Sequence, residues 1–523
     1  MSKFIRVWLW LSVVYFSNNL SAQLNLQQIG HLPYAPLSLA GCKAYVDSTG
    51  GEWALVGTSA GLSIVDLNDP TQPVERFAVP GLPNNWREVR TWKGFAYVGS
   101  EAQGSGITIV DLRELPDNVT WKVWLGDGAY DSLLQRSHTV QCVGGYLYIF
   151  GGGDVTSGCT IADISDPWNP HIVGKYTLAY VHDGFIRGDT LWASEIFDKR
   201  FAVVDISDRT DPQLITTQPT PGAFNHNAEL SDDNRFLFTT DEKPNTPLGS
   251  FDVSDLDNIT LLDTYFPSPK PSAEVHNVRV KGNFLVNPSY GGQLTIVDAT
   301  RPDNLIETAW VVVGNSLVWD ADPYLPSGIV FATAKNEGLF IFQPTYQHAS
   351  WLEGFVTDSV TGQPLNAAKV FVLNTPNADT SRITGQYKTG AALPGSYTIR
   401  AEKPGYQTKF ITDVTLQTNQ VTALDIALVP EIVSTQHPDF EKNILVSPAP
   451  FSDRIAVEIR PGSPFAGTGT MIRLSDFSGK MILEKRSSGE RTLLENLGHL
   501  PGGTYLITLQ NRVGERHSIK IVK

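Results

Sequence analysis

Cysteine is scarce in this chain of 523 residues, which contains only three, at Cys42, Cys142 and Cys159. Three cysteines are too few for a disulfide-based scaffold, and Cys142 and Cys159 fall on strands separated by another strand in the repeat described below. We therefore expect all three to be buried small apolar side chains without disulfide bonds.

Basic residues are also few, with 40 Lys and Arg against 54 Asp and Glu, for a net charge of -14. No basic cluster stands out along the chain. Nucleic-acid binding depends on a positively charged face that neutralises phosphates, so this composition argues against a nucleic-acid partner.

Long apolar runs are missing after the first 22 residues. Residues 1–22 have the form of a secretory signal peptide, with Lys3 and Arg6 before the apolar stretch 7–16 and small residues before Gln23. That stretch is too short to cross a bilayer, and nothing later reaches the roughly 18 apolar residues that a membrane helix needs. We expect an exported chain that begins at Gln23, has no transmembrane helix, and is secreted or held at the outer cell surface.

A short apolar stretch ending in aspartate recurs through the first two thirds of the chain. Its first copy is residues 61–70, GLSIVDLNDP, and the equivalent positions follow at intervals of 42 to 52 residues. They are Asp66, Asp111, Asp163, Asp205, Asp252, Asp298 and, in a degenerate copy, Gln343. Seven copies at this period, built from short strands, predict an all-β fold with a seven-bladed β-propeller over residues 23–345.

Each repeat contains four short apolar runs separated by turns, which is the number of strands in one blade. The aspartate stretch is the third strand, and the Asp-x-x-Asp-Pro segment after it favours a turn, so we interpret these aspartates as structural. The last repeat lacks a fourth strand. Residues 26–32 resemble the outer strand at 170–176, so we expect the N-terminal segment to complete the last blade and close the ring.

The aspartate stretch and its turn resemble the LVIVD repeat, and the run of such repeats is similar to the choice-of-anchor B group of exported bacterial proteins. The resemblance covers about residues 24–345. It implies the propeller fold and supplies no catalytic residue.

Two further domains follow the repeats. Residues 351–430, with EGFVTD, GQPL, AAKVFV and PGSYTI, resemble the carboxypeptidase-regulatory-like β-sandwich, which implies a spacer or binding module. Residues 431–442 have the composition of a linker. Residues 443–523, with SPAPF, LSDFSGK and LPGGTYLI, resemble the C-terminal sorting domain of type IX secretion, although Ala449 replaces the usual asparagine. That resemblance implies the type IX secretion machinery as a partner.

One aligned position of the propeller is rich in histidine. Propellers often place their sites at a channel mouth, where the innermost strands begin. Aligned on their inner hairpins, the seven blades carry at this position Cys42, Arg87, His138, His182, His226, His276 and Trp319. The chain has ten histidines, so four at one repeat position are unexpected by chance.

Acidic residues mark a second loop of the blades, which should open on the same side. This loop carries Glu101, Asp154, Glu195, Asp241, Glu242 and Glu337. Histidines with carboxylates suit zinc or a similar divalent metal, which is the cofactor that the sequence indicates. The alternative is that each histidine hydrogen-bonds a neighbouring loop and locks blade to blade.

We therefore expect an exported scaffold that binds an extracellular protein or glycan at the channel mouth, with Arg87 and the acidic residues beside the histidines. The alternative function is a metal-dependent hydrolase or lyase using the same four histidines, although we favour a protein that is not an enzyme. The sequence itself names no ligand.

Overall fold

The computed structural model describes residues 23–153, 157–268, 273–314, 317–431 and 443–523. The expected signal peptide, most of the expected linker and Asp154 lie outside these ranges. The described chain is built of β-strands, with two short 3-10 helices, η1 (Gly128–Tyr130) and η2 (Ile196–Asp198). No helix within the described ranges is long and apolar enough to cross a membrane.

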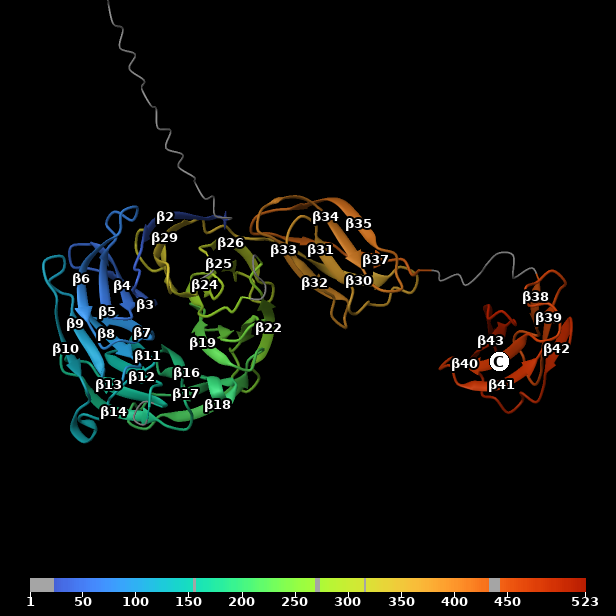
Figure 1. Ribbon diagram of the computed structural model, residues 1–523, viewed down its shortest axis with the longest axis horizontal. Coiled ribbons are helices and arrows are strands. Elements are labelled where there is room, and N and C mark those ends of the chain that lie inside the picture. The colour runs from blue at the N-terminus through green and yellow to red at the C-terminus, as the bar shows by residue number, and fades with distance from the viewer. Residues whose placement is uncertain (1–22, 154–156, 269–272, 315–316, 432–442) are drawn as a thin grey trace, which may run out of the picture. The chain divides into compact units, whose positions relative to one another are not determined.

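Seven antiparallel sheets are arranged in a ring, which confirms the predicted seven-bladed propeller (Figure 1). The first strand of each sheet lies innermost, where it contacts the first strands of the neighbouring blades. These inner strands are β3 (Leu39–Val46), β7 (Arg87–Trp92), β11 (Thr139–Val143), β15 (Asp183–Arg187), β19 (Asn225–Leu230), β23 (Arg279–Lys281) and β27 (Val318–Asp322). The second strands are β4 (Glu52–Thr58), β8 (Phe95–Ser100), β12 (Tyr146–Phe150), β16 (Thr190–Glu195), β20 (Phe236–Asp241), β24 (Phe284–Ser289) and β28 (Val330–Ala334).

Six of the seven third strands end in the repeated aspartate, and the seventh has Gln343 near its end. They are β5 (Gly61–Asp66), β9 (Ile107–Asp111), β13 (Cys159–Asp163), β17 (Arg200–Asp205), β21 (Leu248–Asp252), β25 (Gln293–Asp298) and β29 (Gly338–Pro344). Six aspartates accept a hydrogen bond from the backbone N–H two residues later, as Asp205 does from Ser207 at 2.8 Å. These bonds stabilise the turn after the strand, which supports the structural interpretation of the aspartates.

The outer strands complete the blades and close the ring. Six come from within the repeats or beside them: β6 (Val74–Pro80), β10 (Thr120–Trp124), β14 (His171–Tyr176), β18 (Gln213–Pro219), β22 (Thr260–Tyr265) and β26 (Ile306–Val312). The seventh is β2 (Leu26–Leu32), which pairs antiparallel with β29, so the predicted closure by the N-terminal segment is confirmed. The short β1 (Gln23–Leu24) adds an unpredicted fifth strand to the sixth blade by pairing with β26.

Glycine at one point of an outer strand allows adjacent blades to approach. A Cβ on Gly30 of β2 would collide with the carbonyl oxygen of Pro70, in the turn after the third strand of the first blade. A Cβ on Gly174 of β14 would collide in the same way with the carbonyl of Arg209. Because the outer strand passes so closely under the neighbouring turn, only glycine fits there.

Apolar side chains fill all seven interfaces between blades. Successive residues of a strand point to opposite faces, so Trp53 packs toward the second blade while Ala54 packs toward the seventh. The interface between the fifth and sixth blades, for example, joins Phe238 and Leu248 to Leu285. The three cysteines are free; Cys42 and Cys159 are buried as expected, whereas Cys142 is half-buried.

A two-sheet domain follows the propeller and belongs to the same compact unit. One sheet contains β33 (Gln386–Ala391), β30 (Ser350–Asp358), β36 (Val421–Ala423) and β37 (Ile426–Leu428). The other contains β32 (Ala378–Thr380), β31 (Lys369–Val372), β34 (Gly395–Glu402) and β35 (Lys409–Leu416).

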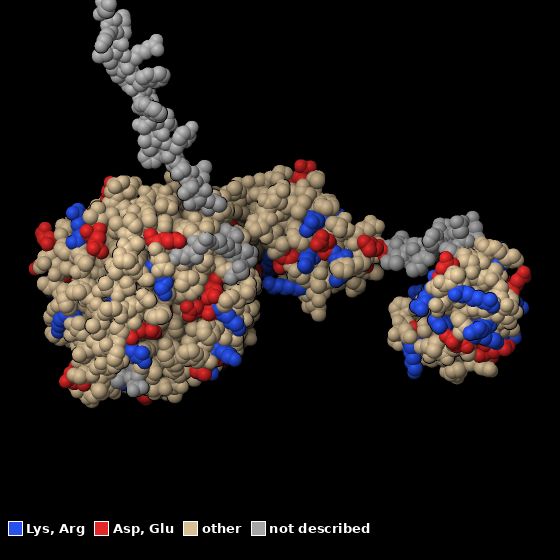
Figure 2. All heavy atoms as spheres, viewed as in Figure 1, with Lys and Arg blue, Asp and Glu red and all other residues tan. Residues whose placement is uncertain are grey.

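On the face shown in Figure 2, acidic and basic side chains are interspersed over the propeller without a continuous basic patch.

A second compact unit contains residues 429–523 with 404–407. Its described strands also form two sheets. The first joins β38 (Ile444–Ser447), β39 (Ile455–Ile459) and β42 (Arg491–Leu494). The second joins β41 (Met481–Arg486), β40 (Met471–Asp476), β43 (Thr504–Gln510) and β44 (Arg516–Val522) around a core of its own.

Candidate metal centre

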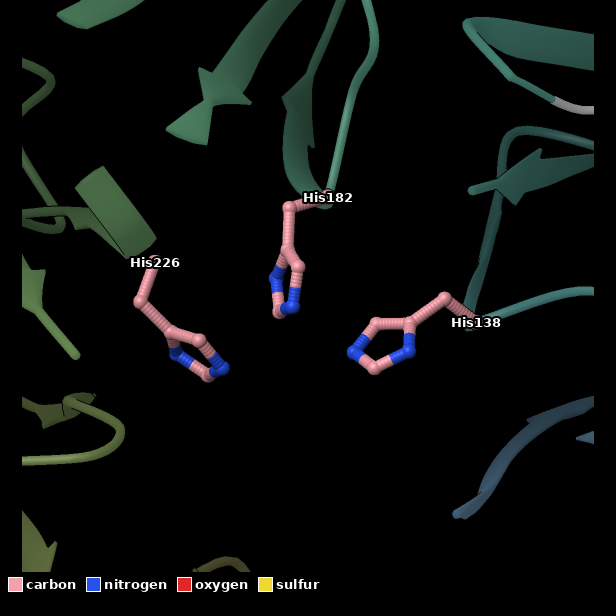
Figure 3. A group of neighbouring side chains, drawn as sticks. All are labelled: His138, His182 and His226. Atoms are coloured by element: carbon pink, nitrogen blue, oxygen red, sulfur yellow. The ribbon is translucent and has the colours of Figure 1, made fainter. Parts of the chain in front are cut away.

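Four histidines converge at one mouth of the propeller channel. His138, His182 and His276 precede inner strands, and His226 is the second residue of β19. Their ring centroids are 4.0 Å apart between His138 and His182, 4.5 Å between His182 and His226, and 4.2 Å between His226 and His276. Figure 3 shows the rings of the first three turned toward one another from three successive blades. The structure thus brings together all four histidines that the repeat alignment selected.

The cluster contains two groups that could hold a metal ion. One is His138, His182 and His226, and the other is His226, His276 and Glu242, with the candidate ligand atoms of each group within 4.8 Å of one another. His226 belongs to both groups. A metal bound by either group therefore needs this residue.

The second group places two hydrogen-bond acceptors face to face. His276 Nδ1 lies 2.5 Å from the carbonyl oxygen of Trp319, which can only accept, so Nδ1 carries the proton of the neutral ring. Nε2 of the same ring is then an unprotonated acceptor. It is buried, has no hydrogen-bond partner among the residues that the structure describes, and faces Glu242 Oε1 at 3.7 Å. Two such acceptors repel each other unless a cation lies between them.

The spacing of this group suits a metal ion. His226 Nε2 lies 3.9 Å from the other oxygen of Glu242, so both distances are too long for a hydrogen bond. Zinc binds nitrogen and oxygen ligands at about 2.0–2.2 Å, which separates neighbouring ligands of a tetrahedral site by about 3.4 Å. The two distances from Glu242 to the imidazoles exceed that spacing by about 0.5 Å or less, and all candidate ligand atoms of the group lie within 4.8 Å of one another.

Neighbouring groups orient these ligands. The Trp319 carbonyl fixes the ring of His276, and Tyr290 donates its hydroxyl proton to Glu242 Oε1 at 2.9 Å. His138 donates from Nδ1 to Glu101 Oε1 at 2.6 Å. Hydrogen bonds of this kind to the outer atom of a ligand are typical of metal sites in proteins.

Burial keeps three of the imidazoles neutral. His182, His226 and His276 are 8%, 4% and 1% exposed, and burial lowers the pKa of each, most strongly for His182 and His276. Burial alone would also lower the pKa of His138, but the hydrogen bond and charge of Glu101 raise it overall. Since a metal ligand must be deprotonated, the group of His226, His276 and Glu242 is better prepared at neutral pH than the group that contains His138.

Two other predicted site residues are engaged elsewhere. Arg87 is buried and donates to the carbonyl oxygens of Thr58 and Leu82, so it holds loops of the first blade. Burial lowers the pKa of Arg87 to about 10. Glu195 accepts from Arg200 of its own blade and from Tyr176, at the end of the outer strand of the third blade. It is the last residue of β16, one position before the residue that follows the strand. Neither residue takes part in the group of His226, His276 and Glu242.

Two predicted acidic residues lie beside the histidines, and the predicted cysteine does not. Glu101 and Glu242 lie with the histidines, as predicted, and Asp154 lies outside the described residues. Cys42 does not align with the histidines, because β3 shifts register between Leu39 and Cys42 and places the cysteine further into the strand.

Sequence reasoning missed Tyr290 and Lys335 at this mouth. Both directly follow a second strand, as Glu101 and Glu242 do in their own blades. The repeat position directly after the second strand could therefore have identified both residues. A search of that position for acidic residues alone overlooks them.

Comparison with known families agrees with this architecture. The LVIVD repeat model matches residues 48–80, 136–178 and 196–220, and the carboxypeptidase regulatory-like domain model matches residues 352–429. The chain therefore contains both. Carboxypeptidase D of Rattus norvegicus is 32% identical over 83 residues, which are 16% of this chain and 6% of that protein.

Solved structures show more distant similarity. A putative 6-phosphogluconolactonase from Bacteroides uniformis is 14% identical with a TM-score of 0.40, covering 52% of this chain and 85% of that one. The β-propeller domain of Cps50 (Swd1) from Myceliophteria thermophila is 12% identical with a TM-score of 0.45, covering 61% of this chain and all of that one, 100%.

Proposed function

We propose that this chain, a propeller of LVIVD repeats followed by a carboxypeptidase regulatory-like domain, is an exported protein that binds a divalent transition metal at its channel mouth. His226, His276 and Glu242 are the ligands, and the metal is zinc or another ion that prefers imidazole. The observation that carries the proposal is the buried Nε2 of His276, which has no partner and faces a carboxylate oxygen at 3.7 Å.

Export is the second part of the proposal. It is supported by the signal-peptide composition of residues 1–22 and by the resemblance of residues 443–523 to the type IX sorting domain. The secretion machinery would recognise that C-terminal domain. The propeller would then meet an extracellular protein or glycan, at the outer cell surface or after release.

Ligand binding is favoured over turnover by the state of the carboxylates. A hydrolase needs a group that takes a proton from metal-bound water. Glu101 already accepts from His138, and Glu242 accepts from Tyr290 and faces two imidazoles. These two acids serve as a ligand and as an orienting group in this arrangement.

The metal proposal is tested by elemental analysis of the full chain, purified without a histidine tag, loaded with zinc and dialysed. We expect about one equivalent of zinc in the wild-type protein and its loss in H226Q and H276Q. H138Q should retain zinc, because His138 belongs only to the other group.

The matched control is H171Q, which alters a histidine that also pairs with a carboxylate, Asp127, but on the outer strand of the third blade. It should bind zinc like the wild type. Wild-type protein without zinc, or zinc kept in folded H226Q, would overturn the proposal.

A further inference from the structure

Lys335 brings an unpaired positive charge to the same mouth. It follows β28 directly, and its Nζ lies 4.6 Å from the ring centroid of Trp319 and 5.1 Å from that of Trp86. Within the part of the chain that the structure describes, Nζ makes no hydrogen bond and no ion pair. Two indole faces therefore hold this ammonium in place of an anion.

Two other partly buried lysines of the propeller have polar partners, whereas Lys175 lies over the ring of Tyr130. Lys43 Nζ donates to Asp322 at 2.7 Å, and Lys281 donates to the carbonyl of Pro323 at 2.5 Å. Half-buried Lys335 differs from both: burial lowers its pKa, and the charge of Glu242 offsets only part of that shift. Removing a cation from water without pairing it costs free energy, so an anion at this place would be stabilising.

Trp319 connects this lysine to the metal ligands. Its carbonyl fixes His276, and its ring centroid lies 4.8 Å from that of His276. The ammonium and the imidazole thus pack against one indole. A metal held by three protein side chains keeps a fourth position open, so two positive centres would stand near each other at the mouth.

We infer that the mouth recognises an oxyanion, a carboxylate or a phosphate, that binds the open position of the metal and accepts a hydrogen bond from Lys335 Nζ. The inference rests on the proposed metal centre, because the metal supplies the second positive charge. Trp86, 39% exposed, offers its ring to the rest of the ligand. The ligand is then an acidic glycan, a peptide carboxylate or a phosphorylated compound, and the anion arms of the test separate carboxylate from phosphate.

The test uses the full chain loaded with Co(II), whose visible absorption reports its coordination, and titrates it with sodium acetate and with inorganic phosphate. A saturable spectral change is expected with at least one anion, and the anion that acts identifies the chemistry. K335Q should weaken the binding of that anion by about tenfold with unchanged cobalt content, since a charge-assisted hydrogen bond is lost. K335R, which keeps the charge, should recover part of the affinity.

The matched control is K122Q, because Lys122 also lies over an indole, that of Trp168, but on an outer strand. It should leave anion binding unchanged. If cobalt does not bind, the metal centre itself is wrong. If cobalt binds but neither anion changes its spectrum, or K335Q and K335R both match the wild type, the metal centre stands and the oxyanion inference is overturned.

Discussion

The channel mouth and the channel interior are built from the same inner strands, but the pairing of their polar groups differs. In the interior, Asp320 accepts from Arg279 Nη2 at 2.7 Å and from Asn277 Nδ2 at 3.1 Å. Tyr324 donates to Glu229 at 2.8 Å, and Asn227 donates to Asp183 at 2.7 Å. The carboxylates there pair with an arginine or accept a hydrogen bond from a side chain of another blade.

At the mouth, the equivalent pairing stops. Within the described ranges His276 Nε2 has no hydrogen-bond partner, Glu242 faces two imidazoles beyond hydrogen-bond distance, and Lys335 lies over indole rings. Buried polar groups in proteins are nearly always satisfied, and although Asn277 Oδ1 in the interior also lacks a partner among the described residues, only at the mouth does an unpaired imidazole nitrogen face a carboxylate. The polar network of the interior holds the blades together, whereas the polar groups of the mouth are arranged as we expect for a binding site.

Trp319 joins the two regions. Its indole Nε1 donates to Glu88 Oε1 at 3.1 Å in the interior, while its carbonyl accepts from His276 at the mouth. Burial, assisted by the charge of Asp320, raises the pKa of Glu88 to about 7. The position of the proposed metal ligands therefore depends on the packing of the interior beneath them.

The largest effect is expected from breaking the interior network. Asp320→Ala leaves Arg279 buried without its closest carboxylate, and such a loss costs about 3–5 kcal/mol of unfolding free energy. Asp205→Ala, which removes a turn hydrogen bond at the solvent-facing end of a third strand, should cost clearly less. Urea unfolding measures both, and equal losses would show that the interior pairs do not hold the ring.

A smaller effect is expected at the mouth when the pH of the metal-free protein falls. The pKa values of His182, His226 and His276 are lowered in the fold, so below pH about 6.5 the unfolded chain binds protons that the folded chain does not. Stability present above that pH is then lost, by up to about 1.4 kcal/mol per pH unit for each such proton. His138, whose pKa is raised, acts in the opposite direction.

This prediction is checked by comparing unfolding free energies at pH 7.5 and 5.5 in the wild type and in H182Q/H276Q. The double variant should lose less stability on acidification than the wild type. If the wild type and the double variant lose the same unfolding free energy between pH 7.5 and 5.5, these imidazoles are not buried in the neutral form.

The sequence was sufficient for the propeller and its closure because the aspartate turn recurs at a fixed position in six blades. Residues 26–32 also share their apolar spacing and a glycine with the outer strand at 170–176. The sequence also located the four histidines with Glu101 and Glu242, since equivalent positions of successive blades converge at the channel. The alignment placed Glu195 with Glu101 and Glu242, but Glu195 is the last residue of its strand, one position earlier than they are. Because successive side chains of a strand point to opposite faces, its carboxylate points away from the histidines. The register shift in β3 and the partners of Arg87 depend on tertiary contacts that no spacing reveals.

The most direct test of the account is the anomalous diffraction of crystals of the zinc-loaded protein at the zinc edge. The account predicts a peak at the channel mouth, about 2.0–2.2 Å from a nitrogen of His226, from Nε2 of His276 and from an oxygen of Glu242. An ordered mouth without a peak, or a peak held by His138 and His182 without His276 and Glu242, would contradict it.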